Sequence, residues 1–193
     1  MKRTLLILLF TVSSLSLIAQ DKTDLKSALT GINDWHKVKD AYAAYIINFP
    51  NQPEKGLTDV PTEKGTVKMH TYTLQSSNDA NLVYMSSYTK YPNSFFPNKL
   101  ESSEKQNEVL DNSVDGAVTN TNGSLVSEKK IVFNGYRGRM IKIALEGDYI
   151  IQMKVVLVGI KLYLAQVIYQ KEDEGNKNAN RFFDSFELIN VKQ

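Results

Sequence analysis

Cysteine is absent from all 193 residues of the chain. This absence excludes disulfide bonds, thiolate zinc sites and cysteine nucleophiles. It also excludes the lipid anchor of bacterial lipoproteins, which is attached to a cysteine at the cleavage site. The composition, 42% hydrophobic and 23% charged, is that of a globular protein. A packed apolar core must therefore stabilise the fold without covalent cross-links.

Histidine occurs only twice, as His36 and His70. A histidine metal site would need both residues with carboxylates such as Asp34 or Asp40, and neither HxH nor HExxH spacing is present. The sequence also lacks a GxSxG elbow, a P-loop and a GxGxxG fingerprint. We predict no catalytic centre, no metal site and no cofactor. A small hydrolase or metal-dependent enzyme that uses His36 or His70 is the alternative hypothesis.

Long apolar runs are missing except near the N-terminus. Basic residues precede an apolar run from Leu5 to Phe10, and small and apolar residues follow as far as Ala19. This pattern is typical of a secretory signal peptide over residues 1–19. No later segment is apolar enough to span a bilayer. We therefore expect an exported protein, periplasmic or extracellular, with an N-terminal lead-in over residues 20–34 and a single domain over residues 35–193.

An excess of charge is missing from the mature chain. The net charge of +2 comes from Lys2 and Arg3, and their removal leaves 21 basic residues against 21 acidic ones. A nucleic-acid or anionic-membrane partner would require a basic excess. Neither kind of partner is expected.

The most regular part of the sequence is the stretch from Gly135 to Tyr169. It contains three apolar, β-branched and aromatic runs that are separated by short glycine-containing breaks. This pattern predicts three adjacent strands at the centre of a sheet. The middle run, Tyr149 to Val158, carries apolar residues on both faces, so both faces of the sheet must be covered.

The rest of the chain predicts further strands and two covering helices. An amphipathic helix is indicated from Asn98 to about Asn120, and a second one carries the apolar spacing from Ala179 to Phe186. The proline-rich segment 50–64 is expected to be a loop. Further strands are predicted over residues 42–49, 65–74, 81–89 and 125–133. The predicted fold is α+β, a three-layer α-β-α sandwich around a largely antiparallel sheet of about six to seven strands.

The C-terminal half resembles the PsbP-like family, whose fold is shared with a nuclear-import factor that binds the GTPase Ran. The resemblance lies in DGAV at residues 115–118, NGYRGRMIKI at 134–143, KLYLAQVIY at 161–169 and RFFDSFEL at 181–188. It implies the same α-β-α sandwich and a protein-binding or accessory role more than catalysis. This sequence departs from the family by having Arg137, Gly138 and Arg139 at the turn where family members often have proline and glycine.

Two groups of residues are candidate binding sites. The first is an aromatic group made of Tyr88, Tyr91, Phe95 and Phe96, which could supply apolar anchors for a partner or could fill the gap between sheet and helix. The second is Arg137 with Arg139, which could bind a carboxylate or phosphate from an exposed turn.

These observations predict an exported, non-catalytic accessory or scaffold domain. It would bind another protein or a small ligand, and neither can be named from the sequence. A carrier of an apolar ligand is a further hypothesis, which requires a cavity between sheet and helix.

Overall fold

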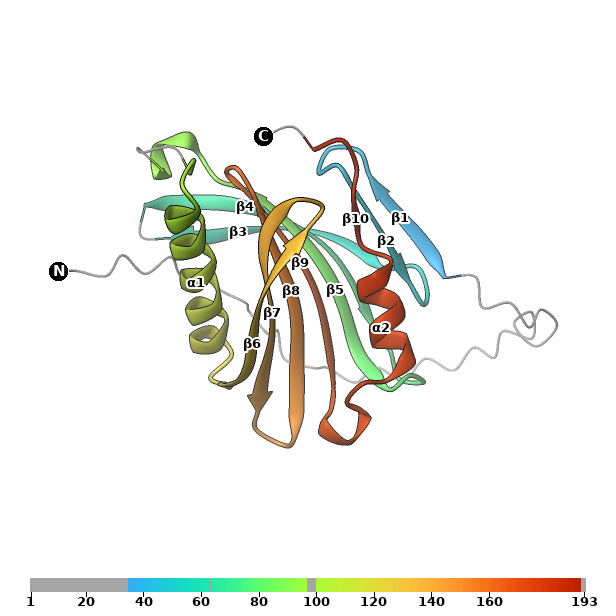
Figure 1. Cartoon of the computed structure of the whole chain (residues 1–193). Helices are drawn as coiled ribbons and strands as arrows, with labels where there is room; N and C mark the ends of the chain where they lie inside the picture. Colours follow the sequence, from blue (N-terminus) through green and yellow to red (C-terminus); the bar gives the residue numbers. More distant parts are fainter. Residues whose placement is uncertain (1–34, 63, 97–99, 192–193) are drawn as a thin grey trace.

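The structure, a computed structural model, describes residues 35–62, 64–96 and 100–191. The expected signal peptide and lead-in lie outside the described residues. Figure 1 shows three layers, in which a strongly twisted sheet separates α1 from a layer made of α2 and a small second sheet. The predicted α+β sandwich is therefore confirmed.

The central sheet has seven strands, and each is antiparallel to its neighbours. Its spatial order is β3-β4-β5-β9-β8-β7-β6. The three strands predicted from the Gly135–Tyr169 stretch are β7, β8 and β9, which form one continuous meander. The bounds are β3 Glu54–Thr62, β4 Gly65–Gln75, β5 Asn81–Lys90, β6 Ser124–Phe133, β7 Tyr136–Leu145, β8 Tyr149–Val158 and β9 Lys161–Gln170.

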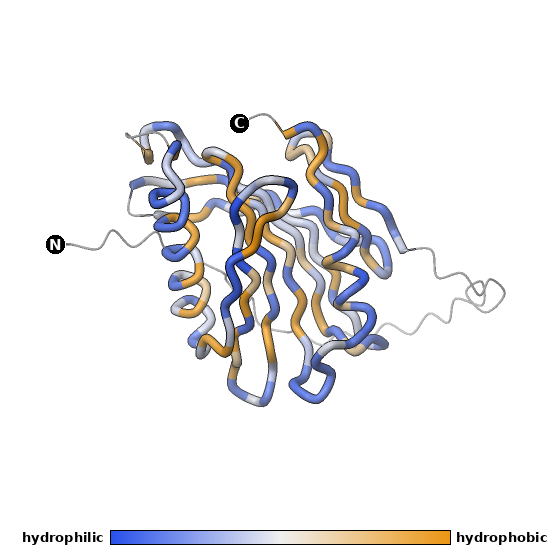
Figure 2. The backbone as a smooth tube through the Cα atoms, viewed as in Figure 1, coloured by the Kyte–Doolittle hydropathy of each residue, from blue (hydrophilic) through white to orange (hydrophobic). Residues whose placement is uncertain are grey.

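Strand β8 is buried on both faces, as its sequence predicts. Ile151 and Met153 belong to the core under α1, whereas Ile150 and Val156 belong to the core under α2. Figure 2 shows the apolar residues concentrated along the strands between the two helices, with polar residues at the turns. A strand with two apolar faces is stable only when both faces are covered.

Helix α1, Ser103–Asn120, covers one face of the sheet through Val109, Leu110, Val114 and Ala117. The prediction that this helix begins near Asn98 is not met, and Asn98 itself lies outside the described residues. Ser102 is the N-cap instead, and its hydroxyl accepts a hydrogen bond from the Lys105 amide at 3.2 Å. A serine in this position satisfies one of the free amides of the first turn.

The opposite face is covered by α2, Lys177–Asp184, together with a three-stranded sheet of order β1-β2-β10. The sequence predicts cover by helices alone, so the small sheet is a correction. Its strands are β1 His36–Asp40, β2 Tyr45–Phe49 and β10 Glu187–Leu188. Helix α2 is only eight residues long and leaves sheet surface that β2 has to cover. Phe182 of α2 packs edge-on against Phe49 of β2, with ring centroids 5.2 Å apart.

The described part of the chain also contains two short 3-10 turns, η1 Asn93–Phe95 and η2 Lys171–Asp173. Within the described residues, no helix combines the length and the apolar character that crossing a membrane would require.

The prediction of a loop over residues 50–64 is wrong, because β3 occupies most of this segment. Strand β3 is an edge strand, and Pro61 lies opposite Thr66 of β4. A proline is tolerated at the edge of a sheet, where one side of the strand has no partner that requires its missing amide.

The predicted strand over residues 42–49 is shortened by a turn. The carboxylate of Asp40 accepts a hydrogen bond from the Ala43 amide at 2.8 Å, and Ala44 has a φ of 59°. The chain therefore reverses at residues 41–44, and β2 begins at Tyr45, antiparallel to β1. Local hydrogen bonding by an aspartate is a common cause of such a turn.

Buried tyrosines are a marked feature of this core. Burial raises the pKa of Tyr45, Tyr84, Tyr91 and Tyr163 well above the ordinary value, and raises the pKa of Tyr169 to about 12. Each of these phenols is harder to ionise in the folded state than in the unfolded state. The stability that they contribute is therefore complete below the unfolded pKa of about 10 and decreases as the pH rises from there through the folded values.

We predict that alkali unfolds the protein and ionises these tyrosines in one step. In a titration followed by tyrosinate absorbance and by circular dichroism, the absorbance change of the buried tyrosines and the loss of structure should coincide, above a pH of about 10. Tyr42→Phe is the control, because Tyr42 is 69% exposed and its removal should leave the unfolding midpoint unchanged. Ionisation of all the tyrosines near pH 10 with the circular dichroism intact would contradict the prediction.

Candidate functional site

The loop aromatics Tyr91, Phe95 and Phe96 pack between the sheet and α1. Tyr91 is fully buried, Phe95 is 6% exposed, and Phe96 is partly buried against the same core. The Tyr91 ring lies edge-on to the Phe96 ring at 5.8 Å. Of the two roles considered for these residues, the structure shows the one in which they fill the gap between the sheet and the helix. Their role in binding stays a prediction.

Arg137 and Arg139 lie within β7 and not in the turn that precedes it, which is a correction to the expected exposed turn. The turn is formed by Asn134 and Gly135, both with positive φ. Arg137 is exposed, but Arg139 is 1% exposed and points toward α1. The two arginines are separated by Gly138, so their side chains lie on the same face of the strand. One of them is nevertheless exposed and the other is buried.

The carboxylates that Arg139 binds belong to the chain itself. Its guanidinium pairs with Asp111 of α1 at 2.5 Å and with Glu128 of β6 at 2.7 Å. It also donates to the side-chain oxygen of Asn107 at 3.2 Å. Arg139 therefore connects α1 to β6 and β7, and its donors are occupied by intramolecular acceptors.

A surface on the other side of the sheet brings together residues that are far apart in the sequence. Leu57 of β3 lies directly opposite His70 of β4, and His70 lies opposite Tyr88 of β5. Tyr42, from the turn between β1 and β2, packs on this row, with its ring centroid 5.3 Å from His70 and 5.8 Å from Tyr88. Tyr42 is 69% exposed and Leu57 56% exposed. We call Tyr42, Leu57 and His70, with Tyr88 beneath them, the Tyr42 surface.

Charged side chains flank the Tyr42 surface on both sides along β3 and β4. On one side Lys55 lies opposite Tyr72, and its ammonium is 5.5 Å from the centroid of the Tyr72 ring. On the other side Lys68 forms an exposed salt bridge with Asp59 at 2.9 Å. An apolar centre with a charged rim is the usual composition of a protein-binding surface.

A buried carboxylate supports this surface from below. Asp40 is 6% exposed and accepts a hydrogen bond from the Tyr72 hydroxyl at 3.0 Å. Burial is the main cause that raises the pKa of Tyr72, and the hydrogen bond to Asp40 adds to it. Burial also raises the pKa of Tyr88. These phenols stay protonated at neutral pH, so they act as hydrogen-bonding and packing groups rather than as bases.

The two histidines lie in different sheets of the described structure. His70 contacts aromatic rings, and His36 lies in β1, which belongs to the second sheet. No group of three histidine, aspartate or glutamate side chains in this part of the chain is arranged to hold a metal ion. Ser86 is fully buried and shares a 2.9 Å hydrogen bond with the Tyr45 hydroxyl, so it is inaccessible to a substrate.

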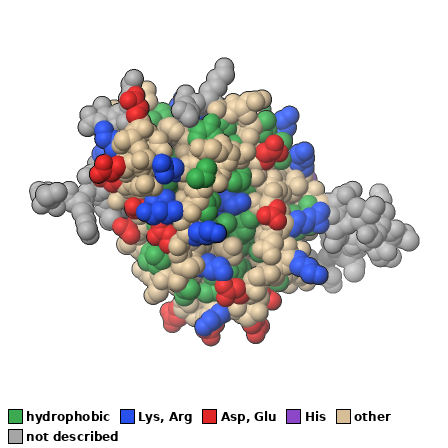
Figure 3. Space-filling model, in the orientation of Figure 1, with side chains coloured by type: hydrophobic (Ala, Val, Ile, Leu, Met, Phe, Trp, Pro, Cys, Tyr) green, Lys and Arg blue, Asp and Glu red, His purple; other side chains and the backbone are tan. Residues whose placement is uncertain are grey.

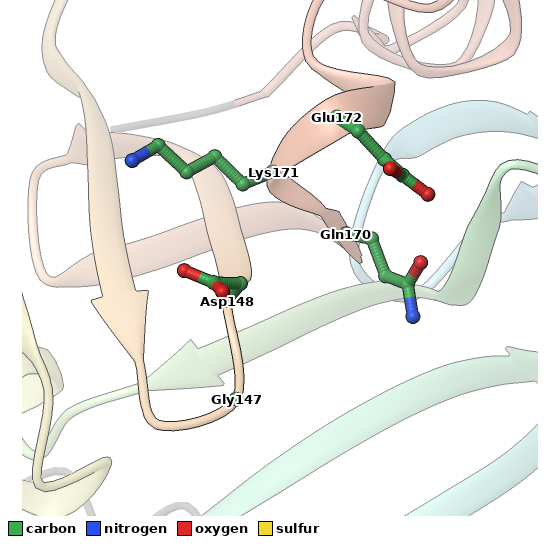
Figure 4. Close-up of a pocket in the computed structure, with 5 residues that line it drawn as sticks. All are labelled: Gly147, Asp148, Gln170, Lys171 and Glu172. Atoms are coloured by element: carbon green, nitrogen blue, oxygen red, sulfur yellow. The ribbon is translucent and has the colours of Figure 1, made fainter.

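A shallow hollow of about 590 Å³ lies at the end of the sheet, between the β7–β8 turn and η2. Gly147, Asp148, Gln170, Lys171 and Glu172 line it, and all five are exposed. Figure 4 shows the side chains of Lys171 and Asp148 extending to one side and those of Gln170 and Glu172 to the other. Small-molecule sites are concave and have converging polar groups. This hollow is open to solvent, and its polar side chains do not converge on one point.

No family model and no curated protein matches the sequence. Among solved structures, the chain is similar to the solution structure of cyanobacterial PsbP (CyanoP) from Synechocystis sp. PCC 6803, with a TM-score of 0.50 and 12% sequence identity. The likeness covers 82% of this chain and 95% of that chain. It confirms the PsbP-like fold that the sequence resemblance implies, and at this identity it shows the fold alone.

The sequence does not reveal the Tyr42 surface. Leu57 falls within a segment whose prolines indicate a loop, and Tyr42 falls within a predicted strand. Only the turn at residues 41–44 brings Tyr42 onto His70. One local signal was present, since Asp40 two residues before Tyr42 is able to form a turn through its side chain.

We predict different effects from substituting the two arginines of β7. Arg139→Met should lower the free energy of unfolding by about 2 kcal/mol, because it removes charge-assisted hydrogen bonds to two elements while leaving carboxylates that water can reach. Arg137→Met, the matched control, should change it by less than about 0.5 kcal/mol, because the side chain is exposed. Urea denaturation measures both values, and equal effects of the two substitutions would contradict the assignment.

Proposed function

We propose that this protein is an exported, non-catalytic accessory domain that binds a partner protein through the Tyr42 surface. The observation that carries the proposal is the convergence of Tyr42 and Leu57 on His70. Both side chains are more than half exposed and lie beside the same histidine, and exposed apolar side chains that cluster in this way mark interaction surfaces. The export is inferred from the N-terminal sequence, and the absence of recognisable reactive motifs supports a non-catalytic role.

A partner protein fits this surface better than a small ligand does. Small ligands bind in concave sites that enclose most of their surface. Tyr42 and Leu57 instead project from the surface, 69% and 56% exposed. Aromatic side chains that project from a rigid support are the usual anchors of protein interfaces, because few of their rotamers are lost on binding.

The support beneath Tyr42 is rigid. Its ring contacts Tyr88, which is buried and packs against Tyr163 at 5.2 Å. The hydroxyl of Tyr163 donates to the Ala43 carbonyl at 2.8 Å, next to Tyr42 in the sequence. Tyr88, a predicted binding residue, is thus proposed to position the anchor rather than to contact the partner extensively.

Site-specific photo-crosslinking in cells that express the full chain tests the proposed surface. A photoreactive phenylalanine at position 42 or 57 should yield the same discrete adduct. The control is the same residue at Glu108, which is exposed on α1, on the other side of the sheet. An adduct that forms equally from all three positions, or from position 108 alone, would refute this surface as the binding site.

With the cross-linked partner purified, Tyr42→Ala and Leu57→Lys should each weaken binding about tenfold or more, because each removes or charges an apolar anchor. Both residues are largely exposed, so thermal melting should be unchanged and should separate a binding defect from unfolding. Isothermal titration calorimetry gives the affinities. Unchanged affinity in both variants would contradict the proposal.

The export is tested separately. N-terminal sequencing of the protein recovered outside the cytoplasm should begin at Gln20, after cleavage at Ala19, or one residue later at Asp21. Recovery of the uncleaved chain in the cytoplasm alone would contradict export. It would not bear on the proposal that the Tyr42 surface binds a partner.

A further inference from the structure

Strand β6, Ser124–Phe133, forms the edge of the central sheet opposite to β3. Among the described residues it pairs only with β7. It lies at the front of Figure 1, whereas β3 and β4 run behind it. Most of its ten residues are exposed, so one row of its backbone amides and carbonyls has no strand to pair with. Such an edge is able to accept an additional strand.

The side chains of β6 suit a second strand at both of its ends. Val126 is 58% exposed and Val132 is 73% exposed. The register with β7 shifts between Leu125 and Ser127, so Val126 occupies an irregularity at the start of the strand. From Ser127 to Phe133 the pairing is regular, which leaves a regular edge of seven residues.

The middle of the β6 edge carries exposed basic side chains, which form no salt bridge within the described residues. Lys129 and Lys130 are exposed on opposite faces of the strand, and Arg137 is exposed on the neighbouring strand opposite Val132. Two carboxylates, Glu128 and Asp111, pair with Arg139, which lies opposite Lys130. Figure 3 shows basic side chains gathered over the middle of this face of the molecule.

We propose that β6 binds an acidic, extended segment of a partner protein by strand addition. The unpaired backbone would bond to the backbone of the segment, and carboxylates of the segment would lie opposite Lys129 and Lys130. Val126 and Val132 would contact apolar residues toward its two ends. Arg137, which the sequence suggests as a carboxylate ligand, would add to the attraction from β7. This surface is separate from the Tyr42 surface, and the two proposals stand independently.

A second copy of the chain fits this edge less well. Antiparallel self-pairing near the middle of β6 would bring Lys129 and Lys130 of both copies together, and like charges directly opposite each other are destabilising. Polyanions without a peptide backbone could satisfy the charges but not the row of amides and carbonyls.

The probe is a synthetic eight-residue peptide of alternating threonine and valine with two central glutamates. Titrated into the isotopically labelled mature protein, it should shift the amide resonances of β6 and slow their hydrogen exchange. A peptide with lysines in place of the glutamates should bind about tenfold or more weakly. Added salt should weaken the binding of the acidic peptide, because the charges that attract it are near the surface and are screened.

Reversing the charge of the two lysines tests whether the acidic peptide binds through their charge or nonspecifically. The double substitution Lys129→Glu and Lys130→Glu should weaken binding of the acidic peptide about tenfold or more. The peptide with lysines should then bind with the higher affinity. The matched control is Lys37→Glu with Lys39→Glu, two exposed lysines of β1, which is the edge strand of the small sheet. This control should leave binding of the acidic peptide unchanged.

Backbone pairing is tested with an acidic peptide whose alternate amides are N-methylated. It keeps the charge but loses backbone donors, so it should bind about tenfold or more weakly. Equal binding of the methylated and unmethylated peptides would overturn strand addition. Resonance changes confined to residues outside β6 and β7, or self-association of the protein through β6 in sedimentation, would overturn the proposal as well.

Discussion

The fold depends on one constraint, namely that the central strand β8 is apolar on both faces. Ile151 and Met153 on one side and Ile150 and Val156 on the other must all be removed from water. The transfer of apolar surface out of water is the dominant favourable term in folding. The chain has no cysteine to supplement it. Two covering layers are the consequence.

A buried cation helps to attach each layer. On the α1 side, Arg139 of β7 holds Asp111 and Glu128. On the α2 side, Lys154 of β8 is 8% exposed and donates to the carbonyl of Phe183, near the end of the helix, at 2.7 Å. A cation near the C-terminus of a helix interacts favourably with the helix dipole. Burial lowers the pKa of Lys154, so part of this gain is offset by desolvation.

The two layers cover the sheet unequally, and the uncovered parts are where we place function. The short helix α2 and the small sheet leave the outer faces of β3 and β4 in part exposed, beside the turn that carries Tyr42. The two edges of the central sheet also differ. Strand β3 carries a proline, which removes a backbone donor, whereas β6 combines two exposed valines with adjacent lysines, which oppose a basic strand and attract an acidic one.

The sequence by itself determined that the central sheet needs cover on both faces, because hydrophobic periodicity is a local property of each strand and helix. The meander β7–β9, the two-sided burial of β8 and the apolar face of α1 were all predictable. The tertiary structure alone decided which residues meet at the surface. The side chain of Asp40 forms the turn that carries Tyr42 onto His70, and the pairing of β3 with β4 brings Leu57 opposite His70. It likewise separated Arg137 from Arg139, which look equivalent in sequence. Contacts between distant segments depend on register and on layer packing, which no local pattern encodes.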